Sequence, residues 1–151
     1  MSLNGVEIGA RYTFSKTVSE SDVYSFAGLT GDFSETHLNE DYMRRRSTIG
    51  TRIAHGALLV GFMSTASTQS IAHLIHREDL EEFPVSLGYD RLRFIRPVRF
   101  GDTVYVHYTV AAIDEEKRRS SANVEVVNQD GEVVAAAVHI MQWTRALSRR
   151  D

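Results

Sequence analysis

Asp32 and His37 are the residues of this sequence best suited to proton transfer. They stand five positions apart across a short turn, so both side chains could converge on one water molecule. A carboxylate and an imidazole can divide the roles of general base and general acid, one taking a proton from water while the other gives a proton to carbon. Imidazole suits this task because its unperturbed pKa of ~6.5 lets it exchange protons near neutrality. The pair therefore predicts chemistry on water.

Gly56 stands directly after His55, at the expected start of a long helix. The first N–H groups of a helix have no acceptor within the helix, and the positive end of the helix dipole favours a ligand oxygen there. Adding water to a double bond conjugated with a thioester carbonyl builds negative charge on the carbonyl oxygen, which fixed donors stabilise. Glycine also lets an acyl group approach the backbone. We therefore predict an oxyanion site at Gly56.

Helices and turns in the first half of the chain should position these residues. A helical N-cap with an acid three residues later follows a strand-like stretch, and a pair of glycines closes the turn before Asp32. The predicted elements are a strand over 11–18, a helix capped by Ser19 that ends within 28–31, a short helix from Asn39, and a long helix from His55 to about Ile75.

The second half of the chain changes to a period of two, which is typical of antiparallel strands with one buried face. Asp130-Gly131 is a strong hairpin signal between the last two strands. We predict four strands in a meander, over 87–98, 102–113, 121–127 and 133–143. Together the elements indicate a single α+β domain over 1–151, with a long central helix wrapped by a curved antiparallel sheet, the hotdog arrangement.

Three segments of the sequence resemble the MaoC-like dehydratases, the (R)-specific enoyl-CoA hydratase family of hotdog proteins. The family pattern is similar to G-D-x-N-P-x-H followed by a helix that opens with H-G. Gly31, Asp32 and His37 match that pattern in register, and His55-Gly56 matches the helix start. Residues 92–103 resemble the strand of the family that ends in proline before a Gly-Asp turn.

The resemblance implies a role for each matching residue. Asp32 and His37 would activate water, the Gly56 N–H would hold the thioester oxygen, and Ser64 would orient the aspartate. Gly31 would belong, with Gly56 and Ser64, to the residues that bind the substrate. For Ser64 the alternative of a hydroxyl bonded to its own helix stays open. The chain departs from the family at Ser34-Glu35, which replace Asn-Pro and remove the rigidity of the proline.

The resemblance implies a reversible hydratase that converts a trans-2-enoyl-CoA into an (R)-3-hydroxyacyl thioester. Two alternatives stay open, an acyl-CoA thioesterase of the same fold and an acyl-thioester-binding protein without catalysis. Coenzyme A enters as part of the substrate, and no metal or redox cofactor is required. Hotdog relatives pair into dimers, so we expect at least a homodimer, with 133–143 as a strand edge that needs covering.

The composition and net charge of the chain argue against several classes of binding partner and of covalent or metal site. A net charge of −3 and a pI near 6.1 argue against a general nucleic-acid binder. The absence of cysteine excludes disulfides and thiolate ligands, and no apolar run is long enough for a membrane span, so we expect a cytoplasmic protein.

His73 and His76 lack a metal-binding motif and are interpreted as helix-end residues. One group of arginines could bind the phosphates of coenzyme A, namely Arg44, Arg45, Arg46, Arg91, Arg93, Arg96 and Arg99.

Overall fold

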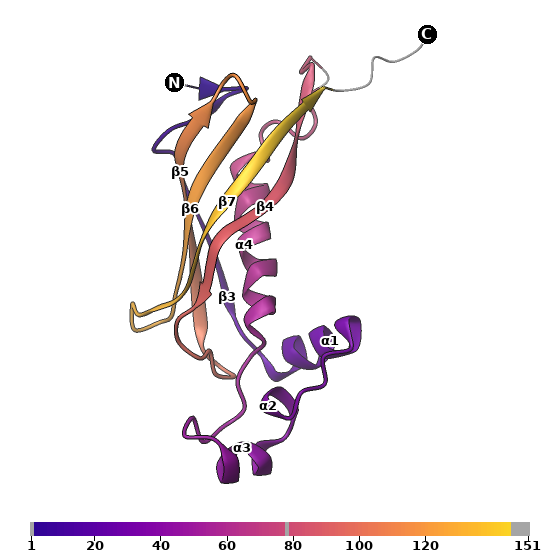
Figure 1. Ribbon diagram of the computed structural model, residues 1–151, viewed down its shortest axis with the longest axis vertical. Helices are drawn as coiled ribbons and strands as arrows, with labels where there is room; N and C mark the ends of the chain where they lie inside the picture. The colour runs from indigo at the N-terminus through magenta and orange to yellow at the C-terminus, as the bar shows by residue number, and fades with distance from the viewer. Residues whose placement is uncertain (1, 78, 146–151) are drawn as a thin grey trace.

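In the computed structural model, which describes residues 2–77 and 79–145, a long helix lies along one face of a five-stranded antiparallel sheet (Figure 1). Three shorter helices gather beyond one end of the sheet, near the start of the long helix. The elements are β1 (Ser2–Leu3), β2 (Val6–Glu7), β3 (Arg11–Thr17), α1 (Glu20–Thr30), α2 (Glu35–Leu38), α3 (Glu40–Arg46), α4 (Gly56–Ser70), β4 (Glu82–Phe94), β5 (Thr103–Asp114), β6 (Arg119–Val127) and β7 (Val133–Arg145). The predicted α+β class with a central helix is confirmed.

The strands of the main sheet are ordered β3-β5-β6-β7-β4, and every pair is antiparallel. The predicted four-strand meander is therefore wrong in one respect, because only β5, β6 and β7 follow one another. β4 pairs with β7 at the far edge, and the segment after Phe94 crosses the end of the sheet to reach β5. β7 is consequently an interior strand, not the exposed edge that the sequence suggested.

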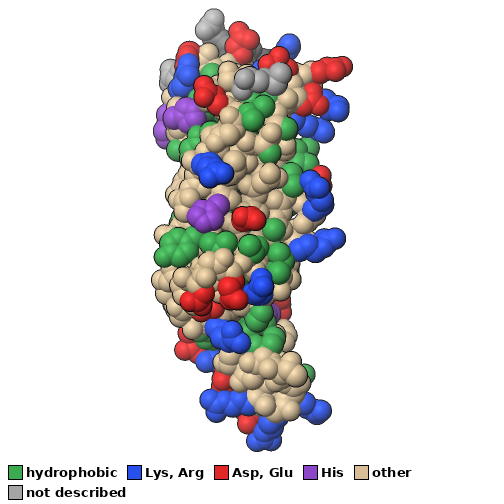
Figure 2. Space-filling view, turned by 90° about the vertical axis from the view of Figure 1, so that its left-hand side faces the viewer, with side chains coloured by type: hydrophobic (Ala, Val, Ile, Leu, Met, Phe, Trp, Pro, Cys, Tyr) green, Lys and Arg blue, Asp and Glu red, His purple; other side chains and the backbone are tan. Residues whose placement is uncertain are grey.

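The alternation in β5 and β6 places one face of the sheet against α4. Val104, Val106 and Tyr108 are at most 3% exposed, and the residues between them, such as His107, are exposed. Each fully buried valine stabilises the fold by ~1.5–3 kcal/mol relative to an exposed one. The outer side of these strands carries charges of both signs between small apolar groups (Figure 2). The predicted hairpin between β6 and β7 is present, with Gly131 at a φ of 77°.

Helix α4 is shorter than predicted. It ends at Ser70 instead of continuing to about Ile75, and turns follow it. Near its end the hydroxyls of Ser67 and Ser70 donate to carbonyls three residues back, a local bonding pattern that competes with helical hydrogen bonds. Leu74 is nevertheless 3% exposed in the turn, so burial there does not require a helix. In the described residues, no helix is both long and apolar enough to cross a bilayer.

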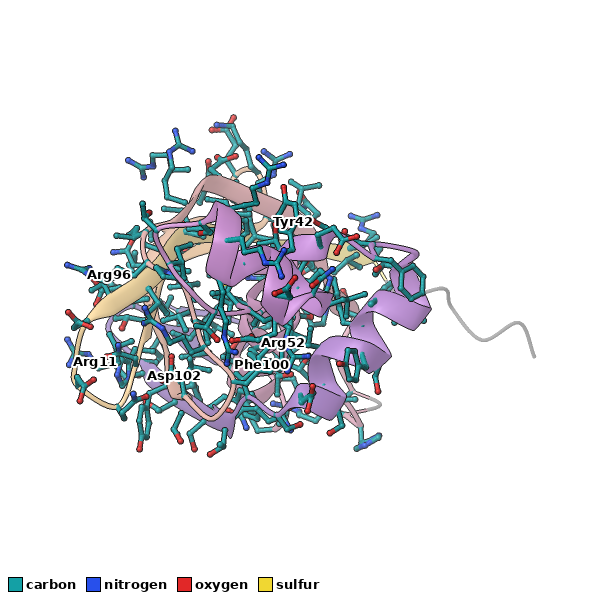
Figure 3. The ribbon with its side chains drawn as sticks, turned by 90° about the horizontal axis from the view of Figure 1, so that it is seen from below. Arg11, Tyr42, Arg52, Arg96, Phe100 and Asp102 are labelled. Carbon is teal, nitrogen blue, oxygen red and sulfur yellow. The ribbon has the colours of Figure 1, made fainter. Side chains whose placement is uncertain are left out.

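Arg52 ties the short helices to the end of the sheet. Its guanidinium lies 2.6 Å from the Glu20 carboxylate of α1 and 3.3 Å from the Glu40 carboxylate of α3. It also lies over the Phe100 ring, 4.8 Å from the centroid, in the segment between β4 and β5 (Figure 3). The hydrogen bond from the Arg52 side chain lowers the pKa of Glu20, and the bond from the Arg52 backbone N–H lowers that of Glu40. This cluster fixes α1 and α3 relative to the strands.

Candidate active site

Asp32 lies just beyond the end of α1. Gly31 adopts the left-handed conformation with a φ of 80°, and its N–H donates to the Ala27 carbonyl at 2.8 Å, which ends the helix. The Asp32 side chain is about half exposed, at 53%. Its Oδ1 accepts a hydrogen bond from the Ser34 N–H at 3.3 Å. The helix end therefore delivers an accessible carboxylate to the start of the next segment.

His37 lies on α2, a one-turn helix where the sequence indicated only a turn. Ser34 is its N-cap, with the hydroxyl accepting from the Thr36 N–H at 3.4 Å. Because serine caps the helix, the turn forms without the Asn-Pro pair of the family. The Nδ1 of His37 donates to the Ile53 carbonyl at 2.8 Å, since a carbonyl oxygen only accepts. In the neutral ring, Nε2 is then free to take a proton.

The structure brings Asp32 and His37 together with a third residue, His55. Ligand-type atoms of the three side chains all lie within 4.8 Å of one another. His55 is 1% exposed, and its Nε2 lies 2.9 Å from the Asp32 carbonyl. Its ring stacks on that of His37, with centroids 3.7 Å apart and planes at 29°. The sequence pointed to His55 only as the neighbour of Gly56, and its contacts with the other two residues were missed.

Gly56 is the first residue of α4, so its N–H has no acceptor within the helix. A methyl group at this position would lie 2.6 Å from the ring of Phe94, which shows how closely the strand side chain approaches the backbone. Next to it is a cleft of about 310 Å³, lined mainly by apolar side chains. Its walls include His37, Ile53, Gly56, Leu59 and Phe94. The cleft thus joins the imidazole to the helix N-terminus.

Ser64 does not join this group within the chain. It is exposed on α4, roughly 12 Å along the helix from Gly56 at 1.5 Å per residue. Among the described residues, no hydrogen bond links its hydroxyl to Asp32, and its carbonyl accepts from the Ser67 hydroxyl at 2.9 Å. The orienting role of Ser64 stays a prediction.

The three clustered side chains raise the question of a metal ion. The Nδ1 of His37 and the Nε2 of His55 each donate to a carbonyl oxygen, at 2.8 and 2.9 Å. Those contacts occupy one nitrogen of each histidine ring. They leave the Asp32 carboxylate, the Nε2 of His37 and the buried Nδ1 of His55 as the remaining candidate ligand atoms. His73 and His76 lie in turns after the end of α4, outside this group and outside a helix.

The arginines expected to meet phosphate are mostly engaged elsewhere. Arg44 and Arg45 form ion pairs with Glu40 and Asp41 on their own helix. Arg96 is the member that lines the cleft, and its guanidinium lies 3.7 Å from the Glu132 carboxylate. A cation at the rim of an apolar cleft is consistent with a ligand that has a charged end.

Comparisons with known proteins identify relatives of this chain. The model of the MaoC like domain matches residues 4–133, a range that contains Asp32, His37 and Gly56. An (R)-specific enoyl-CoA hydratase of Rhodospirillum rubrum is 37% identical over 114 residues, covering 75% of this chain and 72% of that protein. A 3-hydroxybutyryl-CoA dehydratase of Methylorubrum extorquens is 35% identical over 116 residues, covering 76% and 67%. The solved structure of the (R)-hydratase from A. caviae, involved in PHA biosynthesis, has a TM-score of 0.76 at 25% identity, covering 90% and 96%.

Proposed function

Because this chain belongs to the MaoC-like dehydratase family, we propose that it adds water reversibly to a trans-2-enoyl-CoA, giving an (R)-3-hydroxyacyl-CoA. The observation that carries the proposal is the position of His37. Its ring stacks on His55, which also contacts Asp32, and its side chain lines an apolar cleft. The names of the relatives from R. rubrum and M. extorquens support the same substrate class. Asp32 and His37 are referred to below as the dyad.

The dyad divides the two proton transfers of hydration. A water molecule between Asp32 and the Nε2 of His37 loses a proton to the member of the dyad that enters the step unprotonated, and its oxygen bonds to C3 of the enoyl group. The C2=C3 double bond opens, and C2 receives a proton from the other member, which enters the step protonated. The proton taken from water then passes between the two members and restores the starting state. One water molecule is added in total. Both transfers come from one side of the substrate, so the addition is syn.

Charge that develops on the thioester oxygen needs a donor, and the Gly56 N–H would supply it. The positive end of the α4 dipole acts at the same point. Donors fixed before the reaction stabilise the transition state without reorganisation. The apolar lining of the cleft would receive the acyl chain, with Leu59 and Phe94 among its walls.

The test follows enoyl absorbance with crotonyl-CoA and longer trans-2-enoyl-CoAs, combined with chiral analysis of the product. We expect hydration by the intact chain and its loss in Asp32→Asn and His37→Ala. Asp41→Asn is the matched control, because Asp41 is an exposed carboxylate that, among the described residues, pairs with Arg45 on α3. Absence of hydration with every chain length would reject the proposal, as would an (S)-product.

Two further assays on the same protein test the two alternative functions. A thioesterase would release free coenzyme A from saturated acyl-CoA, which a thiol reagent detects. A binding protein without catalysis, the alternative motivated by Ser34-Glu35, would bind enoyl-CoA tightly and leave it unchanged. The cap that Ser34 provides for α2 favours catalysis, because it maintains the turn between the members of the dyad.

We also propose a homodimer, formed along the β4 edge of the sheet. In the described part of the chain, β4 pairs on one side only, and exposed strand edges invite pairing with another chain. Phe83, Val85 and Leu87 belong to this edge strand and are 47%, 43% and 53% exposed. Apolar side chains beside unpaired backbone groups favour a second copy that adds its own edge strand. Sedimentation of a monomer at micromolar concentration would refute the dimer.

A further inference from the structure

His55 is the N-cap residue of α4, yet its side chain makes no capping hydrogen bond. The ring turns away from the helix, toward the dyad. Its Nε2 lies 2.9 Å from the Asp32 carbonyl and 4.0 Å from the Asp32 carboxylate. One face of the ring stacks on His37, and Phe26 packs nearby with centroids 4.8 Å apart. A single buried side chain therefore contacts both members of the dyad.

The hydrogen bonding of His55 identifies its tautomer. A carbonyl oxygen accepts and never donates, so the Nε2 of His55 carries a proton. Its Nδ1 is buried and has no hydrogen-bond partner among the described residues. A proton on Nδ1 would be a buried donor without an acceptor, which is unfavourable, whereas a bare lone pair there costs less. The neutral ring with its proton on Nε2 fits the surroundings.

The segment that carries Asp32 needs an external support. It has no regular secondary structure between the end of α1 and the start of α2. Its local hydrogen bonds are 3.1 Å from the Phe33 N–H to the Gly31 carbonyl and 3.3 Å both from the Asp32 N–H to Thr30 and from the Ser34 N–H to the Asp32 carboxylate. The 2.9 Å bond from His55 instead connects Asp32 to the start of α4, 23 residues away in sequence.

His37 is supported from two directions. The Ile53 carbonyl holds Nδ1 at 2.8 Å, which sets the rotation of the ring about its side chain. The His55 ring covers one face at 3.7 Å, which sets the tilt of the ring plane. With both contacts made, the free Nε2 keeps one direction relative to the Asp32 carboxylate.

We propose that His55 is a positioning residue, which holds Asp32 through its Nε2–H and His37 through ring stacking in the geometry that hydration requires. The proposal rests on the proposed function. His55 is 1% exposed and does not line the cleft, so it acts through the dyad and not on the substrate. Its loss should lower kcat while leaving KM nearly unchanged. A misplacement of about 1 Å at a reacting group costs on the order of 100-fold in rate.

Two substitutions separate the two contacts. His55→Phe keeps a ring for stacking and removes the donor, and we expect kcat to fall on the order of 100-fold. His55→Gln keeps an N–H near the position of Nε2 and should recover on the order of tenfold of that loss, since one good hydrogen bond to the Asp32 carbonyl returns. His73→Phe, in the turn after α4, is the control and should retain the activity of the unchanged chain. Wild-type kcat in His55→Phe, or a rise in KM that accounts for the whole loss, would overturn the proposal.

A second measurement does not depend on catalysis or on the folding of variants. Long-range ¹H–¹⁵N spectra of the unchanged chain report which ring nitrogen of each histidine carries the proton. We expect Nε2–H for His55 and Nδ1–H for His37 in the neutral rings. An Nδ1–H tautomer at His55 would overturn the positioning role even in an active enzyme. If the chain lacks hydratase activity, the proposed function fails, and the spectra still decide whether His55 holds Asp32.

Discussion

Replacing Gly56 with alanine tests the proposed oxyanion site by adding one methyl group. The new Cβ would lie 2.6, 2.7 and 2.8 Å from three carbon atoms of the Phe94 ring. Carbon atoms pack best at ~3.5–4.0 Å, so a contact this short is strongly repulsive. Phe94 is 52% exposed, so its ring can move outward while the helix stays in place. The displaced ring and the methyl group would then both crowd the cleft at the Gly56 N–H.

The expected effects on stability and activity differ in size. Alanine is favoured over glycine in helices by ~1 kcal/mol, so the free energy of unfolding should change by no more than about that amount. Loss of access to one oxyanion donor costs roughly 100- to 1,000-fold in kcat. Gly61→Ala is the matched control on the same helix, because nothing lies within 4 Å of the added Cβ. It should gain up to ~1 kcal/mol of stability and keep its activity.

Steady-state hydration of trans-2-enoyl-CoA and urea unfolding of both variants provide the comparison. Wild-type kcat in Gly56→Ala would refute the assignment of the oxyanion site to this N–H. The double variant Gly56→Ala with Phe94→Ala separates the two sources of crowding. Recovery of activity there would assign the loss to the displaced ring, whereas a persistent loss would assign it to the methyl group over the donor.

Three further predictions concern stability and assembly. Burial lowers the pKa of His139 to about 4. The free energy of unfolding should therefore be highest above the unfolded-state pKa of ~6.5 and decrease by about 3 kcal/mol as the pH falls toward 4. Urea unfolding of His139→Gln should lack this decrease. Arg52→Lys loses the planar donors that reach two carboxylates and should lower the melting temperature, unlike the exposed Arg45→Lys. Leu87→Glu should shift the sedimenting species to the monomer, whereas the equally charged Leu29→Glu, on 85% exposed Leu29 of α1, should not.

The sequence predicted the buried face of individual strands correctly, but it did not predict the order of the strands in the sheet. Alternation in β5 and β6 marks a buried face because successive side chains point to opposite sides. Alternation carries no information on which strand lies alongside. The segment between Phe94 and Thr103 is long enough either to form a hairpin or to cross the end of the sheet. The order β7-β4 is therefore a property of the three-dimensional packing, and it moved the exposed edge from β7 to β4.

The parts of the site that depend on neighbouring residues in the chain could be predicted from the sequence, whereas those that depend on distant residues could not. The end of α1 depends on the conformational freedom of Gly31, which a sequence reveals directly. The one-turn helix α2 is too short to produce a periodic signal, so the sequence predicts only a turn there. The role of His55 depends on contacts with residues 18 and 23 positions away in the chain, and residue type alone does not predict such contacts.

Residues 52–56, which include the His55-Gly56 motif, contact several different parts of the site. Arg52 pairs with carboxylates of α1 and α3. Ile53 exchanges hydrogen bonds with α2, through its N–H to the Thr36 carbonyl and its carbonyl to the His37 ring. The Ala54 N–H donates to the Val98 carbonyl beyond β4, His55 donates to Asp32, and Gly56 begins α4. Each successive residue thus holds a different element in place. A shift of this segment by one residue would disconnect every part of the site at once, whereas the sheet, which pairs through other residues, would keep its strand order.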